Sequence, residues 1–249
     1  MRNFIKIIIT SVFLLFTNLS FAIDMHLPHW IYDKNEKWGE LSPQFKECSI
    51  GKEQSPIDIL TKLVTKLHLP TLEFNYENSK AEMVNNGYTI QVNLANGGSV
   101  KLTSGMYEFL QFHFHTPSEE AINGKRYPMV VHLVHKNLRG DFSVIAVLFA
   151  EGKENASLKE IFNLMPIKEG DKVNLQSKFN VASFLPSKQT YYTFKGSLTT
   201  PPCTQDVDWV VLKQPVEASK QQIAAFMKIF KMNARPIQPL NGRKIYEGV

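Results

Sequence analysis

The chain has 249 residues, of which 43% are hydrophobic and 20% charged, a composition typical of one globular domain of the larger size that all-β folds reach. Its 28 basic and 23 acidic residues leave a formal charge of +5, and the basic side chains are scattered without a dense run. This pattern argues against a nucleic-acid-binding protein and favours a solvated surface of mixed charge.

The first 22 residues have the features of a secretory signal peptide. Arg2 and Lys6 precede the apolar run 7–16, and residues 20–22 place small side chains at the two positions that a signal peptidase reads. An uncleaved anchor is the alternative, but the run is shorter than the roughly 20 residues needed to span a membrane. We therefore predict cleavage after Ala22, which lowers the formal charge from +5 to +3, and no stable membrane insertion.

The remaining chain, 23–249, contains no linker, repeat or low-complexity segment, so we predict one domain in which short strands dominate. Residues 88–94 alternate between apolar and polar side chains, and the turn residues 95–98 predict a hairpin with 99–103 as its returning arm. Four further strands are expected, and the one over residues 142–150 is apolar on both faces and should lie centrally in the sheet. These further strands are predicted over residues 110–115, 129–135, 142–150 and 209–212.

Two helices are predicted, and each should present an apolar stripe to the core. The first covers residues 157–165, with its stripe at Leu158, Ile161, Phe162 and Met165. The second begins at Ser219, whose capping-box partner is Gln222, and its stripe consists of Ile223, Phe226, Met227 and Phe230. The expected fold class is mainly β (α+β): a single domain with a large central twisted, mostly antiparallel sheet and short peripheral helices.

The segment QFHFH (111–115) is the strongest candidate for a metal site. Side chains alternate between the two faces of a strand, so Gln111, His113 and His115 share one face, and Leu110 shares the other with two phenylalanines. Two imidazoles on one face can chelate a metal ion. A third on a neighbouring strand would leave the fourth tetrahedral position for water, as in catalytic zinc sites.

A third ligand is expected from the strand 129–135. In this strand His132 shares one face with Val130 and Val134, whereas His135 lies on the opposite face. Only one of these two histidines can therefore join the first pair, and the alternation alone does not say which.

The two cysteines, Cys48 and Cys203, form an even pair in a chain that we expect to be exported, so we predict one disulfide between them. The alternative, two thiolate metal ligands, lacks a CxxC-type partner for either residue.

Seven motifs follow one another along the chain: QSPIDI (54–59), NNG (85–87), QFHFH (111–115), HLVH (132–135), GSLTTPP (196–202), VDW (207–209) and RPIQPL (235–240). Together they closely resemble the α-class carbonic anhydrases, especially their exported bacterial members. The resemblance extends from about Trp30 to Arg243, which is nearly all of the expected mature chain.

This resemblance implies a zinc-dependent enzyme that reversibly hydrates carbon dioxide to bicarbonate and a proton by attack of zinc-bound hydroxide. It assigns one Zn²⁺ per chain to His113, His115 and His132, and so selects His132 rather than His135. Carbon dioxide, bicarbonate and water are the expected partners. The bacterial periplasm is the expected location. Dimers are common among the bacterial members, so a homodimer is compatible with the resemblance.

The resemblance also implies roles for residues around the metal. Thr199 is expected to accept the hydrogen of the hydroxide and to donate its own to Glu119, which requires a hydroxyl and a carboxylate. Gln111 and the backbone carbonyl of Asn233 are expected to accept hydrogen bonds from ligand imidazoles. Thr200 is expected to place a second hydroxyl near the substrate. The carbon dioxide pocket is expected to be lined by apolar side chains, those of Val134, Val147, Leu198, Val207 and Trp209.

Three residues depart from the family pattern. Val130 occupies the position of a glutamate that orients the third ligand, and loss of such a group typically costs about 10- to 100-fold in affinity or activity unless another acceptor compensates. Tyr88 occupies the position of the histidine that transfers protons. A phenol holds its proton too tightly for this role at neutral pH, so proton transfer should be weakened unless buffer or another histidine takes over. Glu120 replaces a histidine beside Glu119.

Two alternatives compete with this interpretation. A catalytically silent binding module on the same fold would lack a zinc ligand or a gate residue, and all of these are present here. A cupin is suggested by Gly105, the pair of histidines in 113–115, Glu119 and Gly124, with Glu119 as a ligand, but its second metal motif has no match after Glu119.

Overall fold

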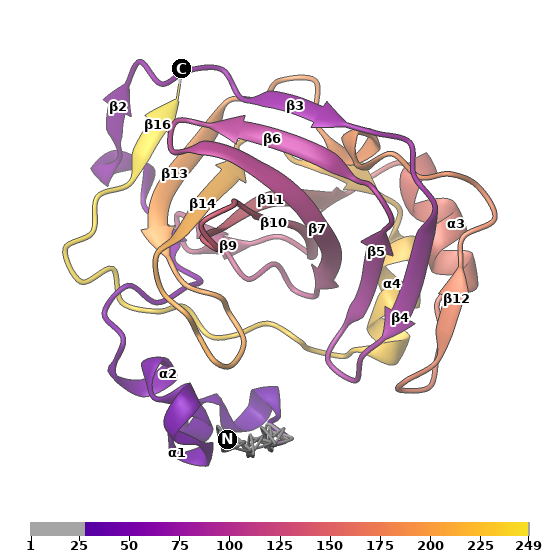
Figure 1. The fold of residues 1–249 in the computed structure, drawn as a ribbon, viewed down its shortest axis with the longest axis horizontal. Coiled ribbons are helices and arrows are strands. Elements are labelled where there is room, and N and C mark those ends of the chain that lie inside the picture. Colours follow the sequence, from indigo (N-terminus) through magenta and orange to yellow (C-terminus); the bar gives the residue numbers. More distant parts are fainter. Residues whose placement is uncertain (1–27, 249) are drawn as a thin grey trace, which may run out of the picture.

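The computed structural model describes residues 28–248, so the predicted signal peptide and its cleavage site lie outside the described residues. Within this range, thirteen strands form one strongly curved sheet and three short strands form a second sheet (Figure 1). The strands of the main sheet are β2 (Thr65–Leu67), β3 (Glu73–Tyr76), β4 (Ala81–Asn85), β5 (Ile90–Leu94), β6 (Gly98–Leu102), β7 (Gly105–His115), β10 (Met129–Lys136), β11 (Phe142–Glu151), β12 (Lys172–Asn174), β13 (Tyr191–Gly196), β14 (Val207–Leu212), β15 (Val216–Ala218) and β16 (Tyr246–Gly248). The second sheet contains β1 (Asp58–Ile59), β8 (Ala121–Ile122) and β9 (Lys125–Arg126).

The helices are short and lie outside the sheet, as the fold-class prediction requires. In Figure 1 the two N-terminal helices lie below the sheet, and the two later ones lie beside β4 and β12. Among residues 28–248 no helix is both long and apolar enough to cross a membrane. The α-helices are α1 (Trp38–Leu41), α2 (Glu47–Ile50), α3 (Ala156–Leu164) and α4 (Lys220–Ile229), and the 3₁₀ helices cover Tyr32–Lys37, Pro43–Phe45, Thr61–Leu63 and Val181–Phe184.

The centre of the main sheet is formed by β7, β10 and β11. The order across the sheet is β12-β4-β5-β7-β10-β11-β14-β13-β16-β2, with β15 beside β11 and with β6 between β3 and β7. Most neighbours pair antiparallel, but β11 pairs parallel with β14, so the sheet is mixed. Residues 143–149 of β11 are all buried, which confirms the central position that its apolar sequence predicts.

The predicted hairpin between β5 and β6 is wrong. Both strands pair antiparallel with β7 and not with each other: β5 pairs with residues 111–113 and β6 with residues 105–108. The eleven residues of β7 are long enough to hold both strands end to end along one edge, so the chain continues in one direction between them. Gly98, the first residue of β6, lies so close to the backbone of β3 that a Cβ atom on it would be 2.1 Å from the carbonyl oxygen of Asn75, so only glycine fits at this position.

A β-bulge interrupts the alternation of β7 at Leu110. Gln111 pairs with Val134 and Phe109 with His135, so Leu110 is the extra residue, and its side chain is 40% exposed. The expectation that Leu110 shares a face with Phe112 is therefore wrong. The bulge lets Phe109 and Phe112 face the same core although three positions separate them.

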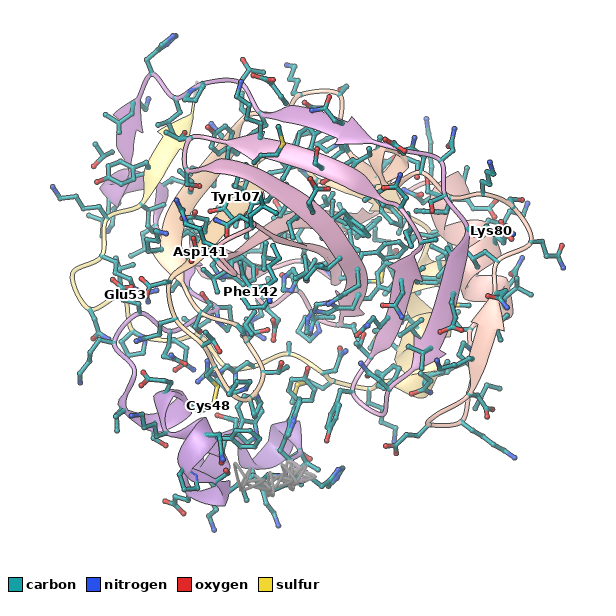
Figure 2. All side chains as sticks on the ribbon, in the orientation of Figure 1. Cys48, Glu53, Lys80, Tyr107, Asp141 and Phe142 are labelled. Carbon is teal, nitrogen blue, oxygen red and sulfur yellow. A yellow bond between two sulfur atoms is a disulfide. The ribbon has the colours of Figure 1, made fainter. Side chains whose placement is uncertain are left out.

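Two apolar cores cover the two faces of the sheet. The larger lies against α3 and α4 and includes Leu158, Ile161, Ile223 and Phe226, as the helix stripes predict. The capping box between Ser219 and Gln222 is also present. One stripe residue differs, since Met227 is 43% exposed. The smaller core lies on the face of His132. Figure 2 shows side chains filling the space that the curved sheet encloses, Tyr107 among them.

His135 is buried on the face of the larger core, away from His132. Its Nε2 atom lies 2.9 Å from the hydroxyl of Tyr76, and its ring packs against Phe109 with centroids 5.5 Å apart. Burial lowers the pKa of His135 to about 3. In the folded protein the imidazole of His135 is therefore still neutral over the pH range, around 6.5, in which the same histidine gains its proton in the unfolded chain.

Acidification is expected to destabilise the fold through His135. Below pH 6.5 the unfolded chain gains a proton at this residue, whereas the folded chain does not until the pH approaches about 3. The free energy of unfolding should fall by about 1.4 kcal/mol per pH unit across this window through this one group. In urea unfolding of the zinc-free protein, His135→Gln should lose about 2 kcal/mol less stability than the wild type between pH 7 and pH 5. Equal losses in the two proteins would contradict this assignment.

Candidate metal centre

Three histidines converge from β7 and β10. His113 and His132 are directly opposite each other in the ladder, and His115 lies two residues further along β7 on the same face. One ring nitrogen from each residue lies within 4.8 Å of the other two. His135 does not belong to this cluster, so the choice that strand alternation leaves open is resolved in favour of His132.

Each of the three imidazoles has one nitrogen next to an oxygen acceptor. The Nδ1 atom of His113 lies 2.9 Å from Oε1 of Gln111, and the Nδ1 atom of His115 lies 2.7 Å from the carbonyl oxygen of Asn233. The Nε2 atom of His132 lies 3.0 Å from Oε1 of Glu120. A nitrogen that faces an acceptor carries the proton, which leaves the second nitrogen of each ring with its lone pair.

The remaining nitrogens form a set that fits a zinc ion. The Nε2 atom of His115 is buried and has no hydrogen-bond partner among residues 28–248. Burial, together with the neighbouring His132, lowers the pKa of His113 to about 3 and lowers that of His115 well below its usual value. At neutral pH these two rings are therefore neutral, as metal binding requires. Three imidazole nitrogens are a typical donor set of catalytic zinc.

The pKa of His132 is shifted in the opposite direction. Burial alone lowers it, but the charge and hydrogen bond of Glu120, with a further contribution from the charge of Glu119, raise it above its usual value. His132 is thus the one imidazole of the cluster that lies between two carboxylates.

Glu119 is fully buried in the loop that follows β7. Its Oε1 atom accepts a hydrogen bond of 2.8 Å from the backbone N–H of Arg235, and its Oε2 atom lies 3.5 Å from Nε2 of His115 and 3.8 Å from Nδ1 of His132. Burial raises the pKa of this carboxyl to about 7, although the charge of His132 and a hydrogen bond with the side chain of Thr199 lower it. The carboxylate therefore lies between the free ring nitrogens and Thr199.

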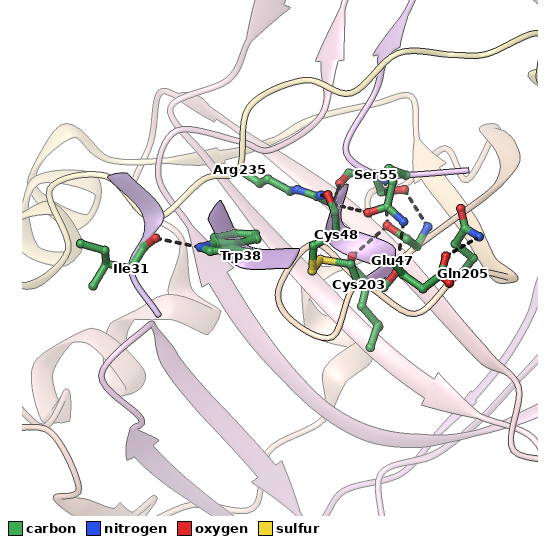
Figure 3. The surroundings of a disulfide bond; sticks show 11 residues. Ile31, Trp38, Glu47, Cys48, Ser55, Cys203, Gln205 and Arg235 are labelled. Carbon is green, nitrogen blue, oxygen red and sulfur yellow. Dashed lines mark hydrogen bonds between the residues drawn. A yellow bond between two sulfur atoms is a disulfide. The ribbon is translucent and has the colours of Figure 1, made fainter. Parts of the chain in front are cut away.

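The loop that carries Thr199 and Thr200 is fastened by a disulfide. Cys203 of this loop is bonded to Cys48 of α2, as the cysteine pair predicts, and Figure 3 shows the surroundings of the bond. Inside the loop, the N–H of Cys203 donates to the carbonyl of Thr200 at 2.9 Å. The loop position of Thr199 is therefore covalently tied to the N-terminal helices.

Arg235 connects these parts, and its role did not follow from the sequence. Its buried guanidinium donates to Oε1 of Gln54 and to the carbonyl of Ser55, both at 2.8 Å, and to the carbonyl of Cys48 at 3.2 Å (Figure 3). Its backbone N–H also holds Glu119. The available signal was that Arg235 and Gln54 both belong to family motifs, which gives no indication that they touch.

Most of the predicted apolar lining lies on the face of the histidines. Val134, Val207 and Trp209 belong to the smaller core, Leu198 packs against it, and the ring of Trp209 lies 5.0 Å from that of His132. Val147 does not belong to this lining. It pairs with Val131 and faces the larger core on the opposite side of the sheet.

Val144 takes the place that was predicted for Val147. It pairs with Val134 in one direction and with Trp209 in the other, and it belongs to the smaller core. The error arose because β11 is apolar on both faces, so its sequence does not distinguish one face from the other.

Tyr88 lies in an aromatic group at the N-terminal side of the site. Its ring is stacked on Trp30 with centroids 3.9 Å apart, and its hydroxyl lies 3.1 Å from Nδ1 of His29. The group borders a pocket of about 440 Å³ that extends to Met232 and Asn233. His29 is exposed and was not predicted as a site residue, because the sequence around it has no motif.

Comparison with known proteins agrees with this geometry. The sequence model for eukaryotic-type carbonic anhydrase matches residues 33–249. A carbonic anhydrase of Neisseria gonorrhoeae is 43% identical over 245 residues, which cover 96% of each chain. The structure of an α-carbonic anhydrase from Thermovibrio ammonificans in complex with sulfanilamide is 42% identical and superposes with a TM-score of 0.86 over 88% of this chain and 98% of the other. This chain therefore belongs to the eukaryotic-type, or α, carbonic anhydrase family.

Proposed function

We propose that this enzyme is an exported carbonic anhydrase that reversibly hydrates carbon dioxide to bicarbonate and a proton, with one Zn²⁺ bound by His113, His115 and His132. The observation that carries the proposal is the convergence of three ring nitrogens whose opposite nitrogens each face an acceptor. Bound there, zinc would supply the positive charge that lowers the pKa of water toward neutrality, an effect for which carbonic anhydrase is itself the reference case.

Glu119 and Thr199 are proposed to orient the attacking water. In its ionised form, which dominates above its pKa of about 7, the Glu119 carboxylate accepts from the N–H of Arg235 and can only accept, so the Thr199 hydroxyl donates to it. The Thr199 oxygen then has its lone pairs free to accept a hydrogen from the water, which turns a lone pair of that water toward the substrate. Thr200, on the same loop, is proposed as a second hydroxyl near the substrate.

The apolar side chains beside the histidines are proposed to hold carbon dioxide. Val134, Val144, Val207 and Trp209 present a buried surface without hydrogen-bonding groups on the face of His132, apart from the indole N–H, which donates to Ser197 at 2.9 Å. A non-polar gas needs a wall of this kind. A silent binding module is less well supported, because the three histidines, Glu119 and Thr199 are all present and together.

The experiment that tests the proposal is a measurement of zinc content by mass spectrometry, combined with stopped-flow hydration of carbon dioxide across pH. We expect one zinc per chain and a hydration rate that is lost on chelation and recovered when zinc is returned. Zinc-independent hydration, or zinc without hydration, would reject it.

Proton export is proposed to limit turnover because Tyr88 replaces a histidine. At low buffer concentration, imidazole should accelerate hydration, and Tyr88→His should raise turnover by about 100-fold, the lower end of what a positioned acid–base group contributes. Tyr88→Phe is the matched control and should leave turnover nearly unchanged. If His29, beside the Tyr88 hydroxyl, already transfers the proton, then His29→Ala will lower turnover and imidazole will have little effect on the wild type.

Export is proposed from the predicted signal peptide together with the disulfide, because disulfides persist in oxidising compartments such as the bacterial periplasm. Cell fractionation, with the mass of the secreted chain, tests both the location and cleavage after Ala22.

A further inference from the structure

Glu120 occupies a position from which it can define the chemistry of His132. Its Oε1 atom lies 3.0 Å from Nε2 of His132, and the side chains of the two residues are 0% and 2% exposed. A carboxylate at this separation accepts a charge-assisted hydrogen bond, so Nε2 carries the proton and Nδ1 keeps the lone pair. The Nδ1 atom is on the side of Glu119 and His115, where the other free ring nitrogens lie.

The neighbours of His132 on its own strand offer no alternative acceptor. Val130 is fully buried, faces the same side of the sheet as His132, and belongs to an apolar core with Leu148 and Ala146. The acceptor must therefore come from outside β10. Glu120 is part of the loop between β7 and β8, and from this loop its carboxylate reaches the Nε2 atom of His132.

This loop is held in place without the carboxylate of Glu120. The backbone carbonyl of Glu120 accepts a hydrogen bond of 2.7 Å from the hydroxyl of Ser118, and Ser118 exchanges hydrogen bonds of 2.8 and 2.9 Å with the backbone of Tyr127. Among residues 28–248, the second carboxylate oxygen of Glu120 has no hydrogen-bond partner. The carboxylate thus contacts His132 and does not support the loop.

We propose that Glu120 is the positioning residue for the third metal ligand, and that in this chain the orienting carboxylate has moved from position 130 on the strand to position 120 on the loop. The proposal rests on the proposed function in one respect, that His132 binds zinc. Its consequence is that Val130 does not weaken the site, because Glu120 on the loop accepts the hydrogen bond that Val130 cannot accept.

The test uses the full mature chain and two measurements, neither of which depends on hydration activity. The first is zinc affinity, measured by competition with a chelator. The second is the tautomer of His132 in the zinc-free protein, measured by ¹⁵N NMR of labelled histidine. Glu120→Ala should weaken zinc binding by about 10- to 100-fold and convert His132 to a mixture of tautomers. Glu120→Gln retains an oxygen acceptor and should lose less than about 10-fold.

The discriminating variant returns a carboxylate to the strand. Glu120→Ala combined with Val130→Glu should recover most of the zinc affinity, whereas the matched control, Glu120→Ala with Val130→Leu, should not. The proposal is overturned if Glu120→Ala binds zinc like the wild type with an unchanged tautomer, or if leucine rescues as well as glutamate. If the wild type bound no zinc, the proposed function would fail, and the tautomer of His132 would still decide whether Glu120 positions the ring.

Discussion

Substitution of His113 by alanine is expected to remove zinc and carbon dioxide hydration together. His113 faces His132 across the ladder between β7 and β10, and its free nitrogen is one of only three in the cluster. Two imidazoles do not complete a catalytic zinc site, so zinc affinity should fall by more than the roughly 100-fold that loss of an outer hydrogen bond costs. Without the metal no reactive water forms at neutral pH, so hydration should fall to the uncatalysed rate.

The effect of His113→Ala is best separated from general damage with two matched controls. His68→Ala removes an exposed imidazole, and His135→Gln removes a buried one from the opposite face of the same sheet. Both should keep a full complement of zinc, measured by mass spectrometry, and their hydration rates in stopped flow should stay close to that of the wild type. Persistent zinc-dependent hydration in His113→Ala would show that the ligand set is wrong.

Removal of the disulfide is expected to cost about 2 to 5 kcal/mol of folding free energy. Cys48 and Cys203 are 155 residues apart, and constraining so long a loop in the unfolded chain gives about 5 kcal/mol in the chain-entropy model, as an upper value. The variant Cys48→Ser/Cys203→Ser should therefore unfold at a clearly lower urea concentration than the oxidised wild type. The same shift should appear in the wild type after reduction, without any substitution.

The two forms of the disulfide test also separate stability from site geometry. Because Cys203 belongs to the loop of Thr199, reduction should lower hydration under conditions in which the protein is still folded. A loss of less than about 1 kcal/mol in both the variant and the reduced protein would mean that the bond constrains neither state appreciably.

The sequence predicts well those features that depend on neighbouring residues. The apolar run of β11, the capping box of α4 and the shared face of His113 and His115 all follow from local periodicity, and all are present. The predicted pairing of β5 with β6 failed because β7, a partner later in the chain, competes for both strands. Local alternation contains no information about such a competitor.

The candidate site was predictable to the extent that its residues lie on strands or in motifs. Val147 was misplaced because the facing direction within a doubly buried strand depends on its register with β10. The contact between Glu120 and His132 was missed because Glu120 lies in a loop, where no periodicity relates sequence position to direction. The sequence does show that Glu120 and Val130 both depart from the family pattern. These are the two positions from which one carboxylate can accept the hydrogen bond of His132.

The bulge at Leu110 determines where the length of β7 can change during evolution without turning a side chain to the wrong face. The odd-numbered positions from Gln111 onward carry the histidines, whereas Phe109, on the other side of the bulge, is an odd-numbered residue of the apolar core. Because Leu110 is the extra residue, its deletion would leave Phe109 and Gln111 adjacent and still on opposite faces. A deletion or insertion among residues 111–115 would instead turn either Gln111 or the histidines toward that core. The turn at Gly124, where added atoms would meet nothing within 4 Å, has no such constraint. Length variation among descendants of this sequence should therefore accumulate in the turns and at Leu110, and should leave the number of residues from Gln111 to His115 unchanged.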